Sequence, residues 1–406
     1  MLNESNQLFD KNFNFRSVLE FIRIHGPISR IDIAKQTNMT AQTVTNITRD
    51  LLEMGFVKEF AKVQDGRGAP SIQLDINPDG AFSIGLDLDE EHITGLLVNM
   101  KGDVLQRISL DLSETDPEFA LQLMTDISKD LIKRSGIKNE SSILGVGVGI
   151  PGPLNFNNET KEELVNPIAL KQWKDVPLAS LLSERLGLKV YLENNATSAA
   201  ISERWFGEGR LINTYFYIFL GSGLGGGLFV NGQVYSGQSG NAGEIGYFPL
   251  GWMSISERNS NLKDHLGQFF NIKALYRSLQ DLGINADRPY HLENLLRMKN
   301  GPFMTWLENA AENLAPFVLG IEYLFDPEAI IFGGRIPQII VQELINRIEV
   351  KISEMRIDRK IAYTPLRLGS VGIDCSSLGA ATIPLYQNLA PLPKRGRGKS
   401  TKMPGY

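Results

Sequence analysis

The chain has 406 residues, 42% of them hydrophobic and 21% charged, and its formal net charge is −5. This length suits two or three globular domains, and the composition is typical of a soluble globular protein. Because the chain has no membrane-spanning apolar run, no signal peptide and a single cysteine, Cys375, which excludes an intramolecular disulfide, we expect a cytoplasmic protein without membrane contact.

The charge is unevenly distributed along the chain. Residues 11–70 contain nine Lys and Arg against six Asp and Glu, a net charge of +3, which leaves −8 for the remainder. The acidic remainder argues against a protein that coats nucleic acid with its whole surface. A mildly basic module on an acidic body is instead typical of a protein that binds DNA at specific sites.

The basic segment begins with three predicted helices. An apolar stripe at helical spacing, made of Phe15, Val18, Leu19 and Ile22, predicts a first helix that ends at residues 25–27. The stretch from Ser29 to Asp32 resembles a capping box and opens a second short helix. After a turn at residues 38–39, Thr40 can cap a third helix. The inward face of that third helix consists of Val44, Ile47, Leu51 and Leu52.

Two short helices joined by a tight turn are typical of a helix-turn-helix, in which the second helix enters the major groove of DNA. Its outward face carries Gln42 and Asn46, which can bind adenine, threonine methyl groups that can contact thymine, and Arg49, which can reach phosphate or guanine. A pair of strands follows, at residues 56–60 and 72–76, and the basic tip between them, with Arg67, predicts a wing for the minor groove. The residues expected at DNA are Thr40, Ala41, Gln42, Thr43, Thr45, Asn46, Arg49 and Arg67.

One alternative remains for this segment, a three-helix interaction module whose polar face is merely solvated. The wing in the expected place favours DNA binding.

From residue 82 the pattern changes to α/β, with apolar strands at 83–88, 95–98, 143–150 and 215–220 alternating with helices. Two glycine-rich segments interrupt it, at 145–153 and 221–227. Such glycines allow backbone amides to approach a ligand closely, and tight strand turns are the alternative.

Four segments then resemble one known family: GVGVGIPGPL from residue 145, NPIALKQWKDVPL to NNATSAA over 166–200, GSGLGGGLFVNGQVYSGQSGNAGEIGY from 221, and FDPEAIIFGGRI from 325. The chain resembles the ROK family of sugar kinases and repressors over essentially its whole length, since the repressor branch carries a winged helix in front of the kinase-like body. The resemblance implies an α/β fold in which an N-terminal winged helix-turn-helix precedes a two-lobed, actin-like, ribonuclease-H-like sugar kinase domain. A cleft would separate the lobes.

Three departures from the family pattern argue against catalysis. Family kinases hold ATP phosphate with an Asp-x-Gly-Gly-Thr loop, whereas this chain has the acidic stretch 89–91, which would repel phosphate. Asn195 replaces the aspartate that serves as the general base, and a carboxamide cannot accept the proton. Tyr247 replaces a zinc-ligating histidine, and residues 252–270 contain none of the three expected cysteines, so His265 has no partner ligands. We therefore expect no enzyme activity, no cofactor and no metal.

The resemblance implies that the sugar-binding groups remain. Neutral amides and one carboxylate suit vicinal hydroxyls. The residues implied for sugar binding are Gly152, Asn166, Asn194, Asn195, Glu244 and Tyr247.

These observations predict a sugar-responsive DNA-binding regulator, a repressor of carbohydrate uptake or catabolism genes. Its expected partners are double-stranded operator DNA and a monosaccharide or sugar derivative, and we expect a homodimer or homotetramer. A degenerate or bifunctional ROK sugar kinase is the alternative, and a scaffold that binds neither DNA nor sugar is a third. We expect a winged-helix domain at 1–77, a first lobe at 80–193 completed by 379–392, a second lobe at 194–378 and a basic disordered tail at 393–406.

Overall fold

The structure is a computed structural model that describes residues 13–63, 71–112, 114–157, 159–160, 162–167, 170–250, 264–357 and 363–390. The predicted wing tip with Arg67 and the predicted tail at 393–406 lie outside these residues. None of the helices in the described part of the chain combines the length and apolar character needed to span a bilayer.

The N-terminal domain is a winged helix. Its helices are α2 (Phe13–His25), α3 (Arg30–Thr37) and α4 (Ala41–Glu53), and its strands are β1 (Ile28–Ser29), β2 (Val57–Val63) and β3 (Ser71–Ile76) in the order β1-β3-β2. The predicted helix-turn-helix and its two following strands are confirmed, although β2 extends three residues beyond the expected end. The four stripe residues of α2 are all buried, as their helical spacing requires.

Side-chain caps fix the two helices of the helix-turn-helix. The Ser29 hydroxyl accepts a hydrogen bond from the Asp32 N–H at 3.2 Å, and Thr40 does the same for the Thr43 N–H at 3.1 Å. Each cap satisfies an N–H group that the first helical turn leaves without a backbone partner. Between them Asn38 adopts a left-handed conformation that ends α3 and turns the chain into α4.

The first lobe of the body contains a five-stranded sheet in the order β10-β7-β4-β5-β6. Its strands are β4 (Phe82–Leu88), β5 (His92–Asn99), β6 (Val104–Asp111), β7 (Ile143–Ile150) and β10 (Val190–Asn194). The helices α5 (Pro117–Ser135) and α6 (Leu178–Leu186) cover it, and β8 (Leu154–Asn157) with β9 (Glu162–Val165) forms a separate hairpin. Strands β4, β5 and β6 pair antiparallel with one another in chain order. Strand β7 pairs parallel with β4, and β10 pairs parallel with β7.

The second lobe repeats this topology. Its sheet has the order β13-β12-β11-β14-β15, again with three antiparallel strands followed by two parallel ones. The strands are β11 (Tyr215–Leu220), β12 (Leu224–Val230), β13 (Gln233–Val234), β14 (Ala329–Gly334) and β15 (Leu366–Leu368). The helices are α8 (Leu266–Phe269), α9 (Ile272–Asp281), α10 (Pro289–Arg297), α11 (Gly301–Phe325) and α12 (Gln338–Met355). The duplication confirms the predicted actin-like body.

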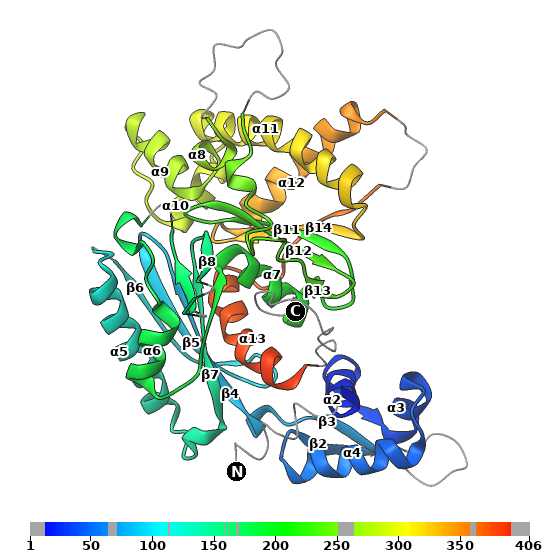
Figure 1. Ribbon diagram of the computed structural model, residues 1–406. Coiled ribbons are helices and arrows are strands. Elements are labelled where there is room, and N and C mark those ends of the chain that lie inside the picture. The colour runs from blue at the N-terminus through cyan, green and yellow to red at the C-terminus, as the bar shows by residue number, and fades with distance from the viewer. Residues whose placement is uncertain are drawn as a thin grey trace.

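Two helices in the middle of the molecule, α7 (Asn195–Phe206) and α13 (Cys375–Leu389), pack against each other and against both sheets (Figure 1). Glycine makes this packing possible, because a Cβ on Gly379 of α13 would lie 1.6 Å from the Ser198 carbonyl oxygen of α7. A Cβ on Gly147 of β7 would likewise lie 1.9 Å from the Ala380 carbonyl oxygen. Gly147 and Gly149 of β7 therefore allow the close approach of α13.

Candidate DNA-binding surface and sugar cavity

The outward face of α4 is exposed to solvent. Ala41, Gln42, Thr45 and Asn46 are exposed in its first two turns, together with Arg49, while Thr43 is half-buried beside the cap. The opposite face packs into the domain core through Val44, Ile47 and Leu51, whereas Leu52, expected inside, is only half-buried. This division leaves an exposed row of amide and hydroxyl groups suited to base edges.

Two of these side chains already bind each other. The Gln42 amide donates to the Asn46 Oδ1 at 3.1 Å, one helical turn away. The pairing aligns both carboxamides on one surface, and each retains polar atoms for a base edge. Arg49 lies 3.3 Å from Asp50 and 3.9 Å from Glu53, so these acids partly neutralise it.

Between the lobes lies a cavity of about 140 Å³. Both lobes and both glycine-rich segments contribute to it. Its lining residues are Asp89, Glu90, Pro151, Gly152, Asn194, Asn195, Phe219, Ser222, Gly223, Leu224, Gly225, Glu244, Gly246, Tyr247, His265 and Gly267. Five of the six residues implied for sugar binding are brought together here.

Asn194 is the best-defined polar group of the cavity. It ends β10 and caps α7, because its Oδ1 accepts hydrogen bonds from the Ala196 and Thr197 N–H groups at 2.8 and 3.3 Å. This fixes the amide orientation, and its Nδ2 donates to the Glu244 Oε1 at 3.3 Å. One Nδ2 proton and the remaining lone pairs of Glu244 stay available to sugar hydroxyls.

Gly152 leaves room for this pair. A Cβ on Gly152 would lie 2.4 Å from the Glu244 Oε1 and 2.9 Å from the Asn194 Nδ2. Burial raises the pKa of Glu244, as expected for a carboxylate that faces a small cavity instead of bulk water.

Tyr247 and His265 form another part of the wall. Their ring centroids lie 5.5 Å apart, and the His265 Nδ1 donates to the Gly246 carbonyl at 2.9 Å. Burial, followed by the charge of Glu244, raises the pKa of Tyr247, so its hydroxyl remains a donor. The sequence did not identify His265 as a cavity residue. An isolated bridge between Pro249 and His265 holds this residue at the cavity wall, and no local sequence pattern predicts that bridge.

Asn166 is the implied sugar residue that does not line the cavity. Its Nδ2 donates to the Asp175 carboxylate at 3.1 Å, and its Oδ1 accepts from the Asp175 N–H at 2.9 Å. Asp175 has a positive φ of 57°, and the paired Asn166 side chain stabilises this turn. Both ends of the Asn166 amide are therefore already engaged.

Side chains of the second lobe contact the acidic stretch 89–91, which stands where family kinases have the phosphate loop. The Asp89 carboxylate accepts from the Ser222 hydroxyl at 2.8 Å and pairs with Arg335 at 3.2 Å. His92 lies 2.6 Å from Asp89 and 3.4 Å from Asp87, and Arg335 also contacts His92. This cluster holds two cations between two buried carboxylates.

The pKa values of the cluster follow from these contacts. Burial acts to raise the pKa of Asp89, but hydrogen bonding and charge from His92 and Arg335 outweigh it and lower the pKa to about 2. Burial likewise acts to lower the pKa of His92, and Asp87 and Asp89 raise it to about 9. Glu90 pairs with Lys273 of α9. The carboxylates of Asp89 and Glu90 are thus each paired with a cation of the second lobe.

No cluster of three His, Cys, Asp or Glu side chains placed to hold a metal occurs among the residues that the structure describes. Most of the segment where relatives carry zinc ligands, residues 251–263, lies outside them.

Comparisons with known proteins agree with this architecture. A MarR family model matches residues 16–68, and a ROK family model matches residues 83–385. The chain is 28% identical over 341 residues to the xylose repressor of Caldicellulosiruptor bescii, covering 80% of this chain and 84% of that protein. It is 27% identical over 244 residues to the Escherichia coli DNA-binding transcriptional dual regulator NagC, 59% of each chain.

Solved structures share the fold. A ROK family transcriptional regulator described as a homolog of the E. coli MLC protein superposes with a TM-score of 0.73 at 22% identity, covering 94% of this chain and 98% of that one. A ROK family glucokinase from Streptomyces griseus, solved with glucose and AMPPNP, gives a TM-score of 0.62 at 20% identity over 75% of this chain and 99% of that one. The chain therefore belongs to the ROK family, with a MarR-type winged helix preceding the two-lobed ROK domain.

Proposed function

We propose that the protein is a sugar-responsive transcriptional repressor that binds operator DNA through α4 and a monosaccharide or sugar derivative in the cavity between its lobes. Its relatives include proteins named as xylose repressors and an N-acetylglucosamine repressor. The genes that it controls would accordingly serve carbohydrate uptake or catabolism.

The observation that carries this proposal is the position of α7. The N-cap of the helix, Asn194, lines the cavity, and its last turn contains Trp205, which contacts α2 of the winged helix. The Arg23 side chain of α2 donates to the Trp205 carbonyl at 3.2 Å, and the Arg210 side chain donates to the carbonyls of Arg23 and Ile24 at 3.2 and 2.7 Å. One helix of 12 residues thus connects the cavity between the lobes to α2 of the winged helix.

A second contact runs through α13. Arg16 of α2 donates to the Ala390 carbonyl at 3.1 Å, directly after the end of α13. Since α13 packs on β4, β7 and α7, any change in the angle between the lobes would move both supports of α2. A sugar that binds one lobe arrangement more tightly would then change operator affinity by the same coupling free energy.

The same geometry supports a regulator without catalysis. Asn195 takes the place of the base and has no carboxylate. Asp89 and Glu90 line the cavity where phosphate would approach, and their carboxylates are bound to Ser222 and Arg335 and to Lys273. A sugar can therefore bind without being phosphorylated.

A homodimer would place two copies of α4 on two half-sites. An apolar cluster at the C-terminal end of α11 supports such an assembly, because Tyr323 and Leu324 expose 57% and 78% of their surface. Burying it between copies would remove that surface from water.

The test is a mobility-shift titration of the promoter region of the protein's own gene, with and without each member of a panel of monosaccharides. We expect specific binding that one sugar changes at least tenfold. ATP-dependent sugar phosphorylation by the same preparation would instead favour the alternative, a ROK sugar kinase. Binding of neither DNA nor sugar would favour the third alternative, a scaffold protein.

A further inference from the structure

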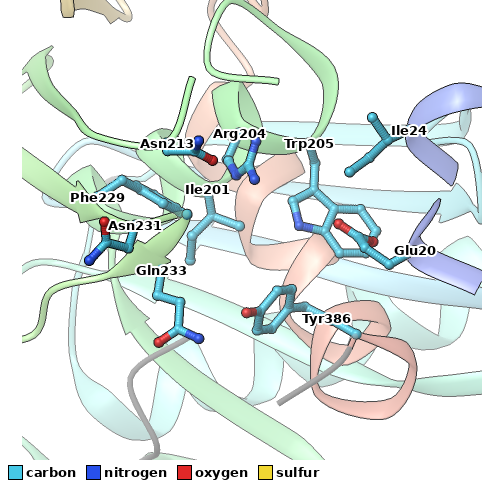
Figure 2. Close-up of a pocket in the computed structure, with 12 residues that line it drawn as sticks. Glu20, Ile24, Ile201, Arg204, Trp205, Asn213, Phe229, Asn231, Gln233 and Tyr386 are labelled. Atoms are coloured by element: carbon cyan, nitrogen blue, oxygen red, sulfur yellow. The ribbon is translucent and has the colours of Figure 1, made fainter. Parts of the chain in front are cut away.

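A second cavity, of about 220 Å³, lies at the junction between the winged helix and the body, outside the sugar cleft. Its walls come from α2, α7, α13 and the turn between β12 and β13 (Figure 2). The lining residues are Glu20, Ile24, Ile201, Arg204, Trp205, Asn213, Phe229, Asn231, Gly232, Gln233, Tyr386 and Ala390. It is larger than the cavity of about 140 Å³ between the lobes.

Three carboxamides line one side of this cavity. Figure 2 shows Asn213, Asn231 and Gln233 on the side opposite Glu20. None of their side-chain amides makes a hydrogen bond to any residue that the structure describes, although each offers both a donor and an acceptor. Such groups suit the hydroxyls of a polyol, which also donate and accept.

Aromatic faces supply the apolar part of the walls. Trp205, Phe229 and Tyr386 line the cavity, and Trp205 is 5% exposed. The indole N–H of Trp205 makes no hydrogen bond to any residue that the structure describes. A ring of this kind can pack against the C–H face of a sugar while its N–H binds a hydroxyl.

The charge of the junction favours an anion. Arg204 donates only through Nη1, to the Gly209 and Arg210 carbonyls, so its Nε and Nη2 have no partner in the described part of the chain. The Glu20 carboxylate is neutralised by Arg23 at 2.7 Å, and burial, which raises the pKa of Glu20, is outweighed by Arg23, Arg204 and Arg210, which lower it. The Glu20 carboxylate is therefore offset by its ion pair with Arg23, and the open edge of Arg204 matches the geometry of a carboxylate or phosphate.

We propose that the junction cavity is a second ligand site, which binds a small polyhydroxylated anion, either a sugar acid or a sugar phosphate. The anionic group binds Arg204, and the hydroxyls bind the three carboxamides. A ligand there contacts the winged helix and the body at once. This proposal does not depend on the proposed repressor function, because binding of the anion is measured without DNA.

The test is calorimetric titration of the full chain with D-gluconate and, separately, with D-ribose 5-phosphate. We expect at least one of them to bind, and which one binds identifies the anionic group. Inorganic phosphate and D-ribose are the fragment controls, and each should bind at least tenfold more weakly. Inorganic phosphate binding as tightly as the best polyhydroxylated anion would overturn the proposal, as would the absence of binding by both anions.

Four variants locate the binding. Gln233→Glu places a carboxylate in the cavity and should weaken the anion at least tenfold, and Asn231→Asp at the exposed turn repeats the test if that protein does not fold. The matched control Gln280→Glu, on the exposed surface of α9, should bind like the wild type. Glu244→Ala in the cleft should also retain binding. Loss in Glu244→Ala, or wild-type affinity in both junction variants, would place the ligand elsewhere and refute the site.

Discussion

Arg23 of the winged helix lies over the indole ring of Trp205 in the body, with its guanidinium carbon 4.2 Å from the ring centroid. The same guanidinium binds Glu20 through Nε and Nη2 at 2.7 and 2.8 Å and the Trp205 carbonyl through Nη1 at 3.2 Å. Its side chain is 11% exposed. Because Trp205 belongs to α7, this contact connects the winged helix to the helix whose N-cap, Asn194, lines the cavity between the lobes.

Replacing Arg23 should uncouple the two sites. Arg23→Ala removes the contact to Trp205 and leaves Glu20 without its ion-pair partner, so the free energy of unfolding should fall by about 2 kcal/mol. Sugar should still bind, but it should change operator affinity less. The double variant Glu20→Gln/Arg23→Ala should recover part of the stability and none of the coupling. An unchanged sugar response in both proteins would show that coupling follows another route.

Removing Glu244 should weaken the sugar specifically. In Glu244→Ala the Asn194 amide and the sugar hydroxyls lose a charged acceptor, which should cost about 1.5–3 kcal/mol, or tenfold or more in affinity. Operator binding without sugar should persist. Glu354→Ala on the exposed surface of α12 is the matched control. Identical sugar titrations of the Glu244 and Glu354 variants would place the effector site elsewhere.

Restoring the family's base should not restore a kinase. In Asn195→Asp the new carboxylate could accept a proton, but Asp89 remains bound to Ser222 and Arg335, and Glu90 to Lys273. We therefore expect no transfer of phosphate from radiolabelled ATP to any sugar in the panel. Turnover in this single variant would mean that the acidic stretch does admit phosphate.

The pKa of His92, about 9, predicts how stability depends on pH. This pKa is raised above the unfolded value of 6.5. The contribution of protonated His92 to the free energy of unfolding is therefore fully present below pH 6.5 and is lost as the pH rises through 9. The loss should be on the order of 3 kcal/mol. The stability difference between wild type and His92→Gln, measured by denaturation from pH 6 to 10, should shrink over this range. Glu193, whose pKa burial raises to about 8, also destabilises the fold as pH rises, but equally in both proteins.

Operator recognition should divide between base and phosphate contacts. Replacing Gln42 or Asn46 by Ala should cost roughly 1–3 kcal/mol on the operator and relax base preference, because each carboxamide can bind adenine bidentately. Arg67→Ala should weaken operator and random duplex alike. The operator should be pseudo-palindromic, since a two-fold dimer reads two half-sites. Equal affinity of the wild type for operator and random duplex would contradict the proposed α4 contacts.

The sequence alone predicted the local structure of the winged helix and the class of the body. Apolar spacing placed α2 and α4, and the caps at Ser29 and Thr40 placed the starts of α3 and α4. These features depend only on residues a few positions apart in the sequence, so local sequence patterns are enough to predict them. The resemblance to known family motifs predicted that Asn194 and Glu244, which are 50 residues apart, belong to one site.

Only the tertiary structure decided which polar groups remain free for a ligand. Asn166 has the right residue type, but Asp175 already occupies both ends of its amide, whereas His265 enters the cavity from a segment without a motif. The ion pairs of Asp89 with Arg335 and the stacking of Arg23 on Trp205 join residues 246 and 182 positions apart. The partners of these side chains are brought near by the packing of whole lobes, and no local pattern in the sequence records those partners.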